Sequence, residues 1–171
     1  MDTSENIAIK FQAITCPNGI IAHLYGPETG SRHDLHLLRR SGLKENMPNW
    51  LHHNGIMYVI YRDPAYKLLS WMNLLFMRTN SVPQKENFNA SMSSVHVSVE
   101  WGFGLIEKYW AFCDYHKNLK LWIQPVGVYY SVACILTNVH TCMNGGNQIS
   151  DFFKISLPSA QEYLHSAPLL N

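Results

Sequence analysis

The feature that most constrains the fold is a run of apolar side chains at helical spacing in the middle of the chain. Its members, separated by 4, 3, 4, 4, 3 and 4 residues, are Phe88, Met92, Val95, Val99, Phe103, Ile106 and Trp110. This spacing predicts an amphipathic helix of about seven turns that begins after Pro83. The side chains expected to be buried on it are Val95, Val99, Phe103 and Ile106.

A second strip of the same helix is polar. Its members are Asn89, Ser93, His96, Glu100, Gly104 and Glu107. Glu100 therefore lies beside the apolar stripe and not within it, with His96 one turn before it and Gly104 one turn after.

The N-terminal part of the chain predicts a β-hairpin. Residues 7–15 alternate partly and predict a strand, and residues 20–25 predict the returning strand. Between them, "CPNG" at 16–19 supplies the residues of a tight turn. The segment 26–34 contains glycine and proline and is expected to be a loop, followed by a short helix over 35–43.

The next segment places an aspartate at the end of a predicted strand. Residues 44–56 are polar and expected to be irregular, whereas 57–61 is a continuous apolar run that predicts a buried strand. Pro64 cannot continue a strand ladder, so Asp63 is expected at the carboxyl end of this strand.

A final helix is predicted to begin near Pro125 and to end at Gly145-Gly146. Its expected core stripe consists of Val128, Val132, Ile135 and Val139. Residues 7–146 are thus interpreted as one partial domain, and 147–171 as a tail that is loose or forms a short helix.

Composition excludes some functions. The 171 residues fit one domain, and 47% hydrophobic content is enough to fill a core. The formal net charge of +1 gives no overall attraction to nucleic acid, so any such role needs a local site or another chain. We find no apolar run of about 18 residues and no signal-peptide pattern, so we expect no membrane association and a nuclear or cytoplasmic location.

Asp63 and Glu100 suggest a metal-dependent reaction. Two carboxylates brought together from a strand and a helix can bind hard cations such as Mg²⁺. In nucleases, two such ions about 4 Å apart activate water and stabilise the leaving oxygen of a phosphodiester. Taken alone, however, an aspartate after a strand is commonly a turn residue and a glutamate on a helix is commonly solvated. The pattern by itself indicates only an α/β domain.

Local motifs narrow the interpretation. In chain order they are "GPETGSRHD" (26–34), "YRDPAY" (61–66), "FN" (88–89), "MSSVHVSVEWGFG" (92–104) and "TNVHTC" (137–142). Together they resemble the catalytic domains of DDE-type transposases, most closely the PIF/Harbinger superfamily with its Harbinger transposase-derived nucleases. The resemblance runs from about Phe11 to Asn144.

The resemblance implies a fold, a reaction and site residues. The fold would be RNase H-like, of the DDE/retroviral-integrase type, an α/β arrangement with a mixed sheet flanked by helices. The reaction would be hydrolysis and strand transfer at DNA phosphodiesters with Mg²⁺ or Mn²⁺. Asp63 matches the family's second catalytic aspartate and Glu100 its catalytic glutamate, both metal ligands. His33 and Asp34 match the family's "HD"; Asp34 could approach the metals or cap its helix, and we favour the cap.

Three departures from the family pattern indicate an impaired site. The family's first catalytic aspartate lies on an upstream central strand, commonly in D-G-T/S, and that strand is apparently missing; no apolar strand accompanies Asp2. Arg62 replaces the usual glycine and could pair with Asp63 in competition with a metal. His96 replaces the usual arginine one turn before Glu100.

Two functions therefore remain open. One is an N-terminally truncated, metal-dependent DNA endonuclease domain. The alternative is a catalytically inactive transposase-derived module that binds other proteins, such as the Myb-like DNA-binding partners of this family.

Overall fold

The molecule divides into two compact units, which are described separately. The computed structural model describes residues 9–61, 69–73, 83–113 and 125–166. Unit 1 comprises residues 1–12 and 28–98, and unit 2 comprises residues 13–27 and 99–171. The strands in the described ranges form three two-stranded sheets among helices, which is compatible with the expected α/β class.

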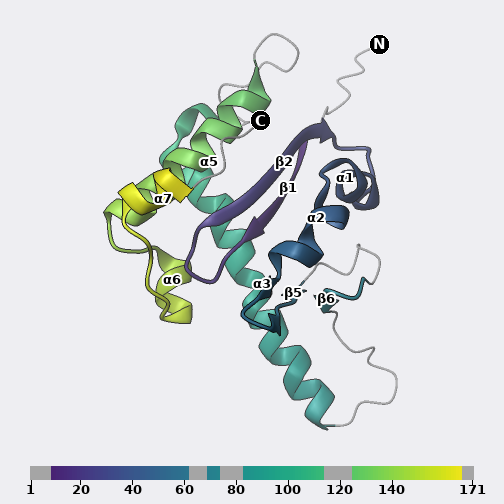
Figure 1. Ribbon diagram of the computed structural model, residues 1–171. Coiled ribbons are helices and arrows are strands. Elements are labelled where there is room, and N and C mark those ends of the chain that lie inside the picture. The colour runs from purple at the N-terminus through teal and green to yellow at the C-terminus, as the bar shows by residue number, and fades with distance from the viewer. Residues whose placement is uncertain (1–8, 62–68, 74–82, 114–124, 167–171) are drawn as a thin grey trace. The chain divides into compact units, whose positions relative to one another are not determined.

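The predicted hairpin is confirmed. Strand β1 (Ile9–Thr15) pairs with β2 (Ile21–Thr29), as Figure 1 shows. In the turn, the Cys16 amide donates to the Ile20 carbonyl at 2.8 Å, and Gly19 adopts φ 84°, which favours glycine. The expected loop over 26–34 is wrong at its start, because β2 continues to Thr29. Both strands of a two-stranded sheet are edge strands, where a proline can be accommodated.

Unit 1 contains two short helices where one was expected. Helix α1 (Asp34–Arg40) confirms the predicted helix, and α2 (Leu43–Trp50) follows directly after Gly42. The expectation of irregular structure over 44–56 is therefore wrong. The segment is polar overall, but buried Leu43 and Met47, one helical turn apart, anchor α2.

The apolar run at 57–61 does not form one buried strand, which corrects that expectation. Strand β3 (His52–His53) pairs antiparallel with β4 (Ile56–Met57), and Met57 is 53% exposed. Only Ile60 and Tyr61 form β5, which pairs in parallel with β6 (Met72–Asn73). The run is divided between two small sheets, and Met57, Tyr58 and Val59 are exposed.

The long helix is confirmed as α3 (Pro83–Tyr109). Of the four side chains expected to be buried, Ile106 is 0% exposed, whereas Val95, Val99 and Phe103 are only half-buried. Ser98 and Gly102 are also buried, so the buried positions 98, 102 and 106 recur every four residues. The buried side thus includes small residues that a search for apolar side chains overlooks.

Unit 2 combines the turn of the hairpin with the C-terminal helices. These are α5 (Val126–Met143), α6 (Gln148–Phe153) and α7 (Ala160–Ser166), with the short 3-10 helix η1 (Ala111–Cys113). Helix α7 lies beside α5 (Figure 1). The core consists of Ile21, Ile106, Cys113, Ala133 and Cys134. The tail, expected to be loose or a short helix, contains α6 and α7; the domain boundary at 146 stays a prediction.

The expected core stripe of α5 is wrong. Val128 is 60% exposed and Val132 44% exposed, while Ile135 and Val139 are half-buried. The residues that α5 buries are Val126, Ala133, Cys134, Thr137, Asn138, Thr141 and Cys142.

Hydrogen bonds to the hairpin explain the polar buried side of α5. The Asn138 side chain donates to the Ile21 carbonyl at 2.9 Å and accepts from the Ile21 amide at 2.9 Å. Its amide group also donates to the Tyr163 hydroxyl at 2.9 Å. Because both the oxygen and the amide group of the Asn138 side chain have hydrogen-bond partners, the cost of burying this side chain is offset. By length and composition α5 could cross a membrane, but these contacts are those of a core helix.

A second asparagine joins α6 to the hairpin turn. The Asn147 side chain donates to the Gly19 carbonyl at 3.0 Å and accepts from the amides of Ile149 and Ser150. It thereby caps α6 and holds the turn at the same time. A Cβ atom at Gly19 would overlap the Asn147 side chain, so glycine is required there for space as well as for φ.

We expect the same substitution to destabilise the protein at one glycine of α3 and to have little effect at another. A Cβ at buried Gly102 would lie 3.3 Å from Thr15 Oγ1, whereas one at Gly104 would meet nothing within 4 Å. Gly102→Val should lower the free energy of unfolding by about 1–3 kcal/mol through overpacking. Gly104→Val should change it by less than about 0.5 kcal/mol. Urea unfolding followed by circular dichroism measures both, and equal losses would contradict the described register of α3.

Candidate functional site

Glu100 is placed on the exposed side of α3. At 100° per residue, Glu100 lies about 200° around the helix from the buried residues Ser98 and Gly102. Its carboxylate has no ion-pair partner within the described ranges 9–61, 69–73, 83–113 and 125–166. An exposed carboxylate without a competing cation there remains able to bind a metal ion.

An aromatic contact links the strand before Asp63 to the helix that carries Glu100. The rings of Tyr61, on β5, and His96, on α3, meet edge to face with centroids 5.9 Å apart and an interplanar angle of 82°. Asp63 itself lies outside the described residues, as does Arg62, so the expected approach of Asp63 to Glu100 stays a prediction. His96 is one helical turn before Glu100 on the same helix.

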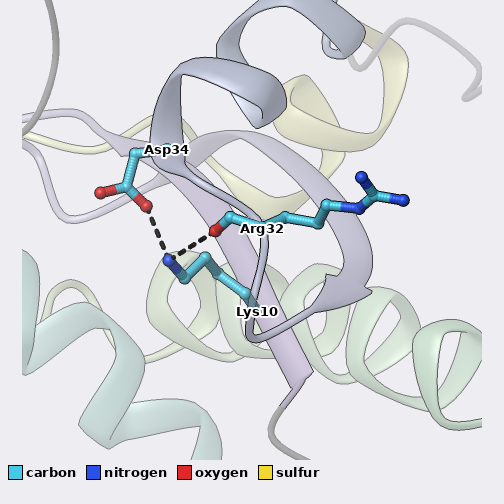
Figure 2. Close-up of polar contacts among 3 residues, drawn as sticks. All are labelled: Lys10, Arg32 and Asp34. Carbon is cyan, nitrogen blue, oxygen red and sulfur yellow. Dashed lines mark hydrogen bonds and ion pairs between the residues drawn. The ribbon is translucent and has the colours of Figure 1, made fainter.

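Asp34 forms an ion pair and does not cap its helix. Figure 2 shows the Lys10 ammonium between the Asp34 carboxylate, at 2.9 Å, and the Arg32 carbonyl, at 3.1 Å. His33 occupies the N-cap position of α1, without a side-chain cap hydrogen bond. The expectation that Asp34 caps α1 is therefore wrong. As the first helical residue, Asp34 still places its negative charge where the helix dipole favours it.

Lys10 is the residue that sequence reasoning missed. It lies on β1, 24 positions before Asp34, so no local spacing connects the two. Its cation lies where a divalent ion would have to bind if Asp34 were a ligand, and like charges repel. Whether Asp34 is a metal ligand stays a prediction, but the pairing weighs against it.

The cysteine thiols are not poised for nucleophilic chemistry. Burial raises the pKa of the Cys134 thiol to about 12, and burial also raises the pKa of Cys16 and Cys142. For Cys113, burial and the nearby negative charge of Glu107 act in the same direction on the pKa. All four thiols therefore stay protonated at neutral pH, and protonated thiols are poor nucleophiles.

Comparison with known protein families identifies the chain. The family model of the DDE superfamily endonucleases matches residues 3–138. This match covers most of the chain, which therefore belongs to that family. Comparisons with curated proteins and with solved structures give no match. Membership suggests a nuclease-derived function with DNA as the ligand, and the superfamily generally uses a divalent metal.

The donor chemistry of the matched region fits such a metal. Asp63 and Glu100 both lie inside residues 3–138, and carboxylate oxygens are the ligands that Mg²⁺ and Mn²⁺ prefer. Within the ranges that the structure describes, no group of three or more His, Cys, Asp or Glu side chains gathers to hold a metal.

We expect measurable but small coupling between Lys10 and Asp34. Both side chains are about one-third exposed, at 33% and 29%, so solvent screens the pair. A double-mutant cycle with Lys10→Ala and Asp34→Ala, followed by urea unfolding, should give a coupling energy of about 0.2–1 kcal/mol that shrinks at 1 M salt. A zero coupling energy at low salt would show that the pair does not form in solution.

Proposed function

We propose that this chain is a Harbinger-type DDE nuclease domain with an RNase H-like fold, whose metal ligands include Asp63 and Glu100. The observation that carries the proposal is the family match over residues 3–138, which spans both carboxylates. The ordered motifs around them support the PIF/Harbinger subtype, since "YRDPAY" and "VEWGFG" occur in the order and spacing of that group.

Each carboxylate has a defined task in this proposal. A bound pair of divalent ions would activate water and stabilise the leaving oxygen at a DNA phosphodiester. Glu100 supplies oxygen ligands from the exposed side of α3, and Asp63 supplies them from the segment after β5. The Tyr61–His96 contact supports this pairing, because it fixes the strand end beside the helix one turn before Glu100.

Asp34 is assigned a structural role. Its carboxylate binds the Lys10 ammonium, which also binds the Arg32 carbonyl, so the pair fastens the start of α1 to β1. An ammonium group already neutralises Asp34, so this carboxylate offers little to a second cation.

We propose that these 171 residues alone do not complete the catalytic site. The matched motifs supply two carboxylates, and the family reaction would use a third as a further metal ligand. Arg62 adds a cation beside Asp63 in the sequence. The third carboxylate would have to come from sequence outside these residues or from another chain.

A binding module without catalysis is the second candidate. The observation that favours it is a set of exposed apolar side chains on one helix, α5, consisting of Val128, Val132, Leu136 and Met143. Contiguous exposed apolar side chains commonly mark protein-binding surfaces. A Myb-like DNA-binding protein in the nucleus would be the partner expected for this family.

Removing Glu100 should selectively weaken metal binding. Glu100→Gln keeps the size of the side chain but removes its charge, and we expect at least about a tenfold loss of Mn²⁺ affinity by calorimetry. Glu107→Gln is the matched control, because Glu107 is exposed on nearly the same side of α3 two turns away. Equal effects of the two variants would contradict the assignment of Glu100.

The 171-residue chain should not nick supercoiled plasmid DNA detectably in Mg²⁺ or Mn²⁺. Arg62→Gly should strengthen Mn²⁺ binding, because it removes a cation that competes for Asp63, without by itself restoring cleavage. A plasmid-nicking assay run beside the calorimetry measures both. Nicking by the purified chain that Glu100→Gln abolishes would show that two carboxylates suffice.

A further inference from the structure

We propose that the exposed arginines at the two ends of α1, Arg32, Arg39 and Arg40, form a surface that binds the backbone phosphates of duplex DNA. This inference rests on the proposed function and deepens it, because it names where the substrate is held. The near-neutral net charge of +1 leaves no overall attraction to DNA, so a DNA-binding protein of this composition needs such a local surface.

The cations of the chain are unevenly distributed between the two units. Every arginine belongs to unit 1. The segment 32–44 concentrates them: its cations are Arg32, Arg39, Arg40 and Lys44, its histidines are His33 and His36, and its acid is Asp34. Guanidinium groups match phosphate geometry with paired hydrogen bonds, so this composition suits phosphate as a ligand.

The Lys10–Asp34 pair neutralises the acid within this segment. Lys10 neutralises Asp34 through its 2.9 Å contact. The same ammonium group also donates a hydrogen bond to the Arg32 carbonyl. The Arg32 side chain extends away from both groups (Figure 2). Lys44 is followed by the exposed Glu45, so the net positive charge lies on the arginines.

The side chains of the three arginines are accessible to a ligand. Arg32, Arg39 and Arg40 are all exposed, and none forms an ion pair with another residue in the described part of the chain. Arg39 and Arg40 lie in the last turn of α1, where the helix dipole already favours cations. That local effect favours the two cations at this position, and within the described residues neither guanidinium group has a hydrogen-bond partner on another side chain.

The dimensions suit a short stretch of DNA. The seven residues of α1 span about 10 Å, at 1.5 Å per residue. Duplex DNA carries one charge per about 1.7 Å of its axis, so roughly six charges fall within that length. Three arginines spread over this distance can therefore reach separate phosphates.

The test measures how DNA affinity depends on salt when no metal is present. The 171-residue chain and its variants are titrated into fluorescein-labelled duplex DNA in EDTA, and fluorescence anisotropy gives the dissociation constant at several salt concentrations. For Arg39→Gln/Arg40→Gln we expect at least about tenfold weaker binding at low salt and a salt slope reduced by about two, one for each lost phosphate contact.

Two further variants separate this surface from net charge. Lys108→Gln/Lys154→Gln removes the same charge from exposed positions in unit 2 and should leave the affinity and the slope nearly unchanged. Arg39→Lys/Arg40→Lys keeps the charge and should keep most of the slope. Equal losses in the two Gln pairs would overturn the proposal, as would equally tight binding of polyglutamate in place of DNA.

These experiments also distinguish a failure of the arginine surface from a failure of the proposed nuclease function. Arginine-dependent DNA binding by a chain without metal affinity would support this surface and refute the nuclease assignment. Glu100-dependent metal binding together with DNA affinity that ignores Arg39 and Arg40 would do the reverse. Thermal melting of each variant by circular dichroism should match the wild type, because both arginines are exposed.

Discussion

The helical register of α3 is the constraint on which the account depends. A helix that buries Ser98, Gly102 and Ile106 must present Glu100 on the other side, because side chains advance by 100° per residue. Packing and chemistry are therefore tied to one rotation of one helix. Gly102 contributes by having no side chain, since a larger residue would meet Thr15.

Local patterns predicted the elements better than they predicted the buried faces. The hairpin, α1, α3 and α5 follow from turn residues and helical periodicity, which are properties of neighbours in sequence. The buried side of α5 does not follow from such patterns. Asn138 is buried there because its side chain forms hydrogen bonds with Ile21, 117 residues away. Apolar counting selected Val128 instead, which is exposed. Long-range polar pairing leaves no periodic signal in the sequence.

The candidate site shows the same division. Glu100 was predicted correctly as a residue beside the apolar stripe, because helix geometry alone decides this. The ion pair of Asp34 with Lys10 was not predicted, because strand and helix are brought together only by the fold. That pair changes the interpretation of unit 1: it weighs against Asp34 as a metal ligand and leaves the arginines around α1 as the groups proposed to bind phosphate. The proposed catalytic and DNA-binding roles thereby fall on different residues.

The central claim is that Asp63 and Glu100 hold the same metal ion. It is tested most directly by loading the chain with Fe²⁺ in place of Mg²⁺ and letting ascorbate and peroxide generate radicals that cut the backbone beside the bound ion. Mass spectrometry then locates the cuts. The account predicts cuts near both residue 63 and residue 100, lost together in Glu100→Gln and unchanged in Glu107→Gln. Cuts near only one of the two positions would contradict a shared metal site.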